Sequence, residues 1–549
     1  MTRRIYALLL GSALIATSGG TPDAARLESD ERTALHVLSR ITFGPRPGDV
    51  ARVQQMGVER FIDEQLHPER IPDTGIAGRL DGFETLGLTS REIAQRYEIP
   101  ALQARRERQK QAGDKQAGDK PGGDKPADPP NQQMAMDPER QRANLPLLEL
   151  SQQRVVRALY SDRQLQEVLT DFWFNHFNVD SRKGPTRYML TEYERDAIRP
   201  HVLGRFRDLL GATAKSPAML FYLDNWMSAD PSGPHVDRAP PGAGALGARL
   251  RQRRQQAGKV GQAAMPQPRP GQQAAGNRPT GLNENYGREL LELHTLGVDG
   301  GYTQKDVTEV ARAFTGWSIQ TPRLGGGYRF AIALHDDREK RVLGHVIEAG
   351  GGERDGEEVL DIVSRHPSTA RFISTKLARR FVSDTPPKTL VDRMAAQFLK
   401  TDGDLRALME VLLTSHEFLS PEADRTKVKN PFEFVVSALR ATGADVRNAV
   451  PVVRAVAQLG MPLYQCQPPT GYKDTADTWV NTGALVNRMN VASAIASGNM
   501  PGVRLPDPPK PDAVAGGVLS ETTRNTIARA QTGEQALALV LGSPEFQRR

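Results

Sequence analysis

Two low-complexity tracts divide the 549-residue chain and limit what it can fold into. The first, near residues 110–140, contains the repeat QAGDKQAGDKPGGDKPADPP, which has balanced charge and no apolar periodicity. The second, at 238–280, is rich in Pro, Gly, Ala and Gln and carries eight basic residues and no acidic one. Neither tract has enough apolar side chains to offset the entropy of ordering, so we predict disorder in both.

The segments outside these tracts are long enough to form a sizeable hydrophobic core. They can pack into one body, because an inserted loop costs little entropy per added residue. In chain order we predict a leader at 1–18, a helical unit at 19–108, a linker at 109–142, a helical core at 143–230, a basic insertion at 231–280, a continuation of the core at 281–445 and a C-terminal helical unit at 446–549.

The N-terminus has the features of a bacterial secretory signal. Arg3 and Arg4 form a basic start, an apolar run follows at 5–16, and small residues come next. This pattern predicts export, with a mature chain that begins near Gly19 and is periplasmic or extracellular. No later stretch reaches the roughly 18 uninterrupted apolar residues of a membrane helix, so we expect no transmembrane segment after signal removal.

The net charge of +7 originates in the second tract, since removing its eight basic residues leaves 7 − 8 = −1 for the rest. We therefore expect no specific binding of nucleic acid. For the tract 238–280 two interpretations stay open. It binds anionic polymers or envelope lipid head groups weakly, or it is a solvated linker without a specific partner.

Helical periodicity dominates the rest of the chain. We predict a mainly α fold, a large multi-helix body with one small β-hairpin and two disordered insertions. One helix, over 367–382, places four apolar residues on one face and Arg and Lys on the other: Ala370, Ile373, Leu377 and Phe381. The strand candidates 328–334 and 341–347 alternate around HDDREK, so they predict a hairpin over 328–347.

The helix predicted over 281–296 concentrates polar residues on one face. At about 100° per residue, four of them share that face, while His294 falls among the leucines: Asn285, Arg288, Glu289 and Glu292. One interpretation is a solvated face with ion pairs between adjacent turns. The other is that the Glu289 and Glu292 carboxylates share a proton, or bind a metal with help from another helix.

His176 lies near the centre of the apolar stripe of a helix predicted at 161–179. A buried imidazole needs a hydrogen-bond partner, so one interpretation is a satisfied core histidine. The functional alternative pairs it with a carboxylate of the 281–296 helix, as a base or ligand. The candidate catalytic set is therefore His176, Asn285, Arg288, Glu289 and Glu292, with the presence of a metal left open.

Other reactive residue types have simpler interpretations. His335 and His345 flank the predicted hairpin and are further candidates, whereas His366 precedes a helix start. Thr303 and Asp306 form either a capping box or the end of a calcium loop, and capping fits better. The single cysteine, Cys466, excludes an internal disulfide and is interpreted as a loop thiol.

No HExxH, GxSxG or Walker motif occurs. The sequence resembles the bacterial family catalogued as domain of unknown function 1800, through HVLSRITFGPRPGDV (36–50), LTDFWFNHFNVD (169–180), 197–225, 281–317, HPSTARFISTKLARRFV (366–382) and SPEFQRR (543–549). The resemblance implies an exported, helical protein. It also implies, as a partner, an exported protein of the family domain of unknown function 1501, which resembles alkaline-phosphatase-like enzymes. The chain departs from the family at Gly471–Tyr472, where a GW pair is usual.

Three functions remain open at this point. The first is an exported scaffold or interaction protein of the cell envelope that works with an exported partner. The second is an exported hydrolase-type or metal-dependent enzyme that uses the Glu289 and Glu292 carboxylates with His176. The third is binding of polyanions or the envelope through the tract 238–280. Convergence of His176 and the carboxylates in one cavity would favour the second.

Overall fold

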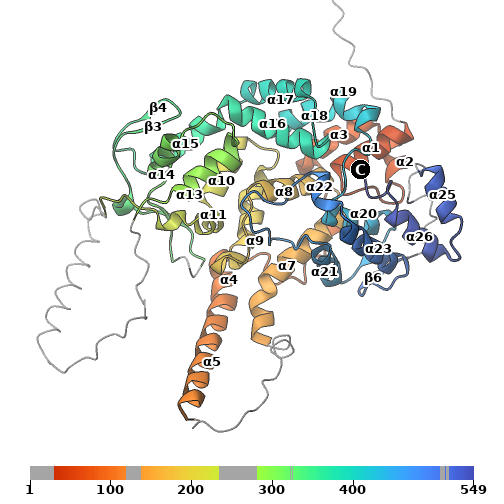
Figure 1. Cartoon of the computed structure of the whole chain (residues 1–549), viewed down its shortest axis with the longest axis horizontal. Coiled ribbons are helices and arrows are strands. Elements are labelled where there is room, and N and C mark those ends of the chain that lie inside the picture. Colours follow the sequence, from red (N-terminus) through yellow and green to blue (C-terminus); the bar gives the residue numbers. More distant parts are fainter. Residues whose placement is uncertain are drawn as a thin grey trace, which may run out of the picture.

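The structure is a computed structural model that describes residues 30–118, 138–233, 281–321, 323, 325–506, 514 and 519–549. The fold is mainly helical, which confirms the predicted class (Figure 1). The predicted leader and the tract 238–280 lie outside the described residues. Within the described ranges, no helix is both long and apolar enough to span a membrane.

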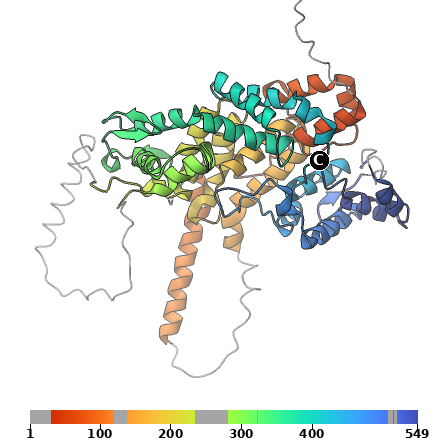
Figure 2. The ribbon, with the colours of Figure 1, turned by 45° about the horizontal axis from the view of Figure 1, so that its top comes forward.

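The helices of the first half extend across the body, and two of them project from it (Figure 1). In order they are α1 (Glu31–Ile41), α2 (Asp49–Met56), α3 (Val58–Leu66), α4 (Ser90–Ile93), the π-helix η3 (Ala94–Glu98), α5 (Ile99–Gly118), α7 (Pro138–Tyr160), α8 (Gln164–His176), α9 (Leu190–Glu192), the π-helix η6 (Tyr193–Ile198), α10 (Phe206–Lys215) and α11 (Pro217–Tyr222). Helices α5 and α7 project from the body, as both views show (Figures 1 and 2). These two helices extend into the predicted linker 109–142.

The second half packs back onto the first. Its helices are α13 (Glu284–Glu289), the π-helix η10 (Leu290–Thr295), α14 (Gln304–Ala313), α15 (Glu353–Ser364), α16 (Pro367–Phe381), α17 (Lys388–Lys400), α18 (Leu405–Leu413), α19 (His416–Leu419), α20 (Pro431–Ala441), α21 (Val450–Gln458), α22 (Ala476–Trp479), α23 (Thr482–Ala496), α25 (Glu521–Ile527) and α26 (Gly533–Gly542). The segment 427–429 pairs with 547–549 through backbone hydrogen bonds, next to the N-terminal helices.

The strands differ from the predicted hairpin over 328–347. Strand β2 (Tyr328–Phe330) pairs with β1 (Trp317–Ile319), and β3 (Lys340–Val342) pairs with β4 (His345–Ile347). A third antiparallel pair joins β5 (Asp445–Val446) to β6 (Val503–Arg504). The pairing of 328–334 with 341–347 was therefore wrong. The positive φ of Gly344 (84°) and Leu343 (49°) allows β3 and β4 to turn tightly on each other, which leaves β2 to pair with β1.

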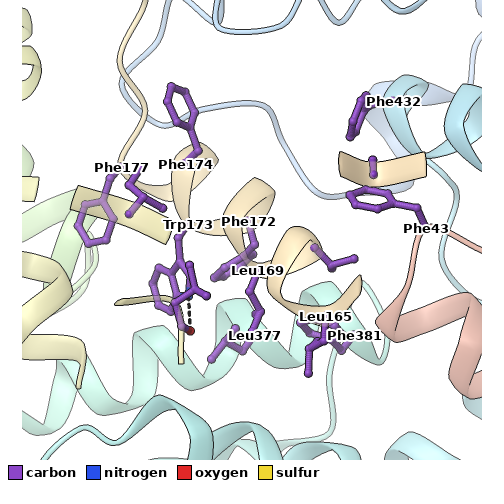
Figure 3. Packing of buried hydrophobic residues seen from close by; sticks show 14 of the residues in the cluster. Phe43, Leu165, Leu169, Phe172, Trp173, Phe174, Phe177, Leu377, Phe381 and Phe432 are labelled. Atoms are coloured by element: carbon purple, nitrogen blue, oxygen red, sulfur yellow. Dashed lines mark hydrogen bonds between the residues drawn. The ribbon is translucent and has the colours of Figure 1, made fainter. Parts of the chain in front are cut away.

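Helix α8 lies at the centre of the main hydrophobic core and packs against α16. Figure 3 shows Leu165 and Leu169 of α8 close to Leu377 and Phe381 of α16. Trp173 is fully buried and donates its indole N–H to the carbonyl of Val202 at 3.3 Å. The four apolar residues predicted to share one face of the 367–382 helix are all buried, which confirms the periodicity.

The segment 284–295 is not the uniform α-helix that the sequence predicted. It begins as α13 and continues as the π-helix η10, in which each N–H bonds to a carbonyl five residues earlier. A π-turn is wider than an α-turn, so the direction of every side chain after Leu290 shifts. The capping box of Thr303 and Asp306 at the start of α14 is confirmed.

Candidate functional site

A cavity of about 290 Å³ lies between α8, α16 and the loop 461–479. We call it the α8–α16 cavity. Part of its wall is apolar and comes from Phe172, Leu463 and Trp479, while the remainder is polar or charged. The polar and charged lining residues include Asn175, His176, Asn178, Lys376, Arg379, Arg380, Tyr472, Lys473 and Asp474.

Two asparagines near the end of α8 hold the loop 461–479 in place. The Asn175 Nδ2 donates to the carbonyl of Tyr472 at 2.8 Å, and the Tyr472 N–H donates to Asn175 Oδ1 at 2.7 Å. The Asn178 Nδ2 donates to the carbonyls of Cys466 and Pro468 at 2.9 and 2.8 Å. Because buried backbone groups need partners, these bonds fix one wall of the cavity.

Gly471 allows the loop to approach α8. Its φ is +71°, and a Cβ at this position would lie 2.2 Å from the carbonyl oxygen of Asn175. A side chain here would therefore push the loop away from the helix. Where the family usually has a Gly-Trp pair, this chain retains the glycine and has Tyr472 in place of the tryptophan. The hydroxyl of Tyr472 donates to the carbonyl of Pro462 at 2.9 Å, within the same loop.

His176 is buried, and both of its ring nitrogens have partners. Its Nε2 lies 3.0 Å from the carbonyl oxygen of His294, and a carbonyl can only accept, so Nε2 carries the proton. Nδ1 is then an acceptor, and it lies 2.8 Å from the Nζ of Lys376. Burial, followed by the Lys376 charge, lowers the pKa of His176 well below its ordinary value, so the ring stays neutral.

Lys376 is half-buried on α16, and its side chain lines the cavity beside His176. Burial lowers the pKa of its amine to about 8, against a weaker opposing effect of Asp474. Among the described residues, no ion pair joins Lys376 to a carboxylate, and its amine also lies over the ring of Phe372 at 5.5 Å. The polar face predicted for this helix is thus only partly exposed, because Lys376 and Arg379 line the cavity together with the loop 461–479.

The cavity has an excess of positive charge. Five of its lining residues are basic and two are acidic, which gives 5 − 2 = +3: Arg154, Lys376, Arg379, Arg380 and Lys473, with Asp171 and Asp474. Arg154 forms an ion pair with Asp171. Arg380 forms an ion pair with the buried Glu433. The same carboxylate also pairs with Arg549 at 3.0 Å. The excess of positive charge therefore lies with Lys376, Arg379 and Lys473.

The carboxylates predicted as catalytic do not line the α8–α16 cavity. Glu289 is half-buried, and its burial, together with the neighbouring charge of Glu292, raises its pKa. Glu292 accepts from the hydroxyl of Tyr302 at 3.4 Å. The charge of Glu292 thus acts on Glu289, but their segment reaches His176 through the backbone carbonyl of His294 and not through a carboxylate.

The remaining residues of that face have local partners. Arg288 donates to Gln304 Oε1 at 2.8 Å and lies 3.9 Å from the Glu284 carboxylate. Asn285 is exposed, and its backbone N–H donates to Asn283 Oδ1 at 2.9 Å. The part of the chain that the structure describes contains no group of three or more His, Cys, Asp or Glu arranged to hold a metal ion.

The other candidate histidines lie elsewhere. His335 is buried, with Nε2 3.0 Å from Asp355 Oδ2, and the same carboxylate accepts from the buried Lys340 at 2.5 Å. His345 is exposed on β4. His366 accepts from the Ser368 N–H at 3.2 Å and begins α16, in agreement with its predicted position at a helix start.

The interpretation of Cys466 as a packed loop thiol is confirmed, because its side chain is buried at the cavity edge. Burial, and then the charge of Asp180, raises the pKa of this thiol to about 11, which disfavours the nucleophilic thiolate. Sequence reasoning missed Lys376. The only local signal was its position three residues after Ile373 and one before Leu377, at the edge of the apolar face.

A family model described as "Protein of unknown function (DUF1800)" matches residues 36–548. The match confirms the resemblance seen in the sequence, and it includes α8, α16 and the loop 461–479. No curated protein and no solved structure matches the chain. An activity must therefore be inferred from the residues of the α8–α16 cavity themselves.

Proposed function

The chain belongs to the DUF1800 family, and from its cavity we propose that it is an enzyme acting on a small organic molecule with an anionic group. The α8–α16 cavity is the substrate site in this proposal. Lys376 and His176 form its reactive centre. One observation carries the proposal: an amine without a carboxylate partner donates to a neutral imidazole inside a cavity.

The cavity supports a small substrate. Its volume of about 290 Å³ is at the lower end of ligand pockets, which span about 300–1,000 Å³. The aromatic walls at Phe172 and Trp479 suit an apolar portion of the ligand. The excess of basic side chains suits an anionic group, because a carboxylate or phosphate would lower the cost of keeping these cations together.

The pair of Lys376 and His176 supports chemistry beyond binding. An ordinary lysine stays protonated near neutrality, whereas a pKa of about 8 leaves a useful fraction of Lys376 as the free amine. The carbonyl of His294 fixes the tautomer of His176, so that the acceptor Nδ1 faces the amine. Lys376 can therefore give or take a proton within the cavity, with the imidazole as its partner.

A panel of small acids tests this proposal. Acetate, succinate, malate and glycerol phosphate are added to the full chain, and the thermal unfolding midpoint is measured, since a ligand of the native state raises it. We expect one class of acid to raise the midpoint of the wild type, and the Lys376→Met variant to lose that shift. Lys388→Met, at an exposed position of α17, is the matched control. Equal shifts in all three proteins, or none in the wild type, contradict the proposal.

A second role, as an exported scaffold that works with an exported partner, is favoured by exposed apolar side chains on α23. Leu485, Val486 and Met489 of this helix are between 38% and 56% exposed, and Val480, just before it, is 49% exposed. Exposed apolar side chains that cluster in this way are typical of interaction surfaces. The signal-like N-terminus supports export. The double change Leu485→Asp and Val486→Asp should abolish co-purification with an exported protein of the family domain of unknown function 1501; retained co-purification contradicts this role.

A further inference from the structure

The surroundings of the half-buried Lys376 differ from those of the buried lysines. Lys340 donates to Asp355 Oδ2 and to the carbonyls of Asp336 and Arg338. Lys427 pairs with Asp384 and donates to the carbonyl of Asp474 at 2.6 Å. Each of these two amines therefore has a carboxylate partner. Among the described residues, the single hydrogen-bond acceptor of Lys376 is the neutral His176, so no carboxylate partner stabilises the charged form of its amine.

We propose that Lys376 is a nucleophile that forms an imine with a small aldehyde or keto acid bound in the α8–α16 cavity. This inference rests on the proposed function and specifies its substrate class. Lysines that react in this way are desolvated and lack a carboxylate that would keep them protonated. Lys429 is also buried and lies over the Phe546 ring at 3.8 Å, but it borders a cavity of only about 50 Å³, too small for a substrate.

The step balances with the groups present. The free amine of Lys376 attacks the carbonyl carbon, a C–N bond forms, and the carbonyl π electrons move to oxygen. Both N–H protons then pass to that oxygen by way of Nδ1 of His176, which lies 2.8 Å from Nζ. The C–O bond breaks and water leaves, so that amine and carbonyl give imine and water with no change of oxidation state.

The acid group of the substrate has a place in the same cavity. Arg379 and Lys473 line it, and neither forms an ion pair with a carboxylate among the described residues. A keto acid would set its carboxylate near these cations while its carbonyl meets Lys376. The pKa of about 8 agrees with this role: at pH 7.5 about a quarter of such amines are free, compared with about one in a thousand of ordinary lysines.

Reductive trapping tests the inference. The full chain is incubated with glyoxylate and cyanoborohydride at pH 7.5, and modified lysines are located by peptide mass spectrometry. We expect Lys376 to be carboxymethylated at least about tenfold faster than the exposed lysines, because of its larger fraction of free amine. It should also react faster than Lys429, whose pKa is likewise lowered by burial but which borders the cavity of only about 50 Å³. The rate at Lys376 should rise with pH around a midpoint near 8. His176→Phe should slow it, since the proton acceptor is lost.

The outcomes separate the two proposals. Modification spread evenly over surface lysines, or a rate at Lys376 that follows an ordinary lysine midpoint, overturns imine formation. If acids without a carbonyl, such as succinate, still raise the unfolding midpoint through Lys376, the proposed function stands and only the imine is rejected. The mapping uses the wild type, so the test does not depend on the folding of a variant. Lys429→Met is the matched control and should leave trapping at Lys376 unchanged.

Discussion

The side-chain amide of Asn175 makes two hydrogen bonds to the backbone of Tyr472, a residue 297 positions away in the sequence. One polar atom donates and the other accepts, so the amide matches the peptide group in the way a neighbouring strand would. The loop 461–479 is thereby attached to the end of α8. The position of this loop decides whether Lys376 lies in a cavity or on the surface.

Asn175→Ala should detach the loop. It leaves an N–H and a carbonyl of Tyr472 without partners, and each unsatisfied buried group costs about 1–3 kcal/mol. We expect the free energy of unfolding to fall by about 2 kcal/mol in urea titrations, with weaker binding of small acids. Asn487→Ala, on an exposed position of α23, should change stability by less than about 0.5 kcal/mol. Equal effects of the two changes would refute this role of Asn175.

Gly471→Ala should destabilise the protein more than an alanine at another glycine with positive φ. Gly460 has φ +92° with nothing within 4 Å of a built Cβ, whereas the Cβ at Gly471 would lie 2.2 Å from the Asn175 oxygen. We expect Gly460→Ala to cost about 1 kcal/mol from backbone strain alone. Gly471→Ala should cost at least about 2 kcal/mol more, because the clash is with backbone. Similar midpoints of chemical denaturation for both variants would show that the loop moves freely.

Glu433→Gln should destabilise the protein strongly. Glu433 is buried and bridges the guanidinium groups of Arg380 and Arg549, which hold its pKa at about 2 although burial opposes this. Removing the charge leaves two buried cations without their shared partner, at a cost of about 3–5 kcal/mol. The pair of Arg393 and Glu417 is more exposed, so Glu417→Gln should cost about 1 kcal/mol or less. The free energies of unfolding of the two variants provide the comparison.

Two buried histidines should make the fold sensitive to acid. Burial, and then Lys376, lowers the pKa of His294 to about 3, and the pKa of His176 is lowered too. The unfolded chain takes up these protons near pH 6.5 while the folded chain does not. The stability that the two neutral histidines contribute is therefore fully present above about pH 6.5 and is lost as the pH falls towards 3.

His294→Leu should reduce this acid sensitivity. Each depressed histidine contributes about 1.4 kcal/mol per pH unit between its two pKa values. The slope of the unfolding free energy between pH 6 and 4 should therefore become shallower by about this amount in the variant. His345→Leu, at an exposed residue of β4, should keep the wild-type slope. An unchanged slope in His294→Leu would mean that His294 is protonated in the folded state.

Glu289→Gln tests whether this carboxylate, predicted from the sequence, takes part in the site at the α8–α16 cavity. Burial and Glu292 raise the pKa of Glu289, so its charge is mildly unfavourable at neutral pH. We expect the variant to be more stable by no more than about 1 kcal/mol at pH 7, with the difference vanishing below about pH 4.5 where Glu is protonated in both states. Acid binding and trapping at Lys376 should be unchanged. A loss of either would restore the carboxylate pair as part of the site.

Local sequence patterns predicted the helices well, because their signals lie within one or two turns. The apolar face of α16 and the capping box at Thr303 depend on residues three or four positions apart. The strand pairing was missed because β1 is only three residues long and has no alternating pattern, whereas 328–334 and 341–347 do alternate. The π-turn of η10 was missed because its apolar residues fit an α-helix equally well.

The candidate site was predicted only in part. His176 stood out because a histidine in an apolar stripe is unusual. Lys376 did not, because a lysine beside an apolar face normally extends into solvent. What covers it is a loop almost a hundred residues later, and no local pattern reports such a contact. The sequence placed Glu289 and Glu292 correctly beside each other, but it could not tell which side of their helix faces α8.

The distance along the chain between Asn175 and Tyr472 also has a consequence for synthesis. At about 5–20 residues per second, the ribosome needs on the order of 15–60 seconds to pass from one to the other. Helix α16 is completed only in the later part of that interval, and the loop 461–479 follows it. The wall that this loop contributes to the cavity around Lys376 is therefore among the last parts of the site to be synthesised.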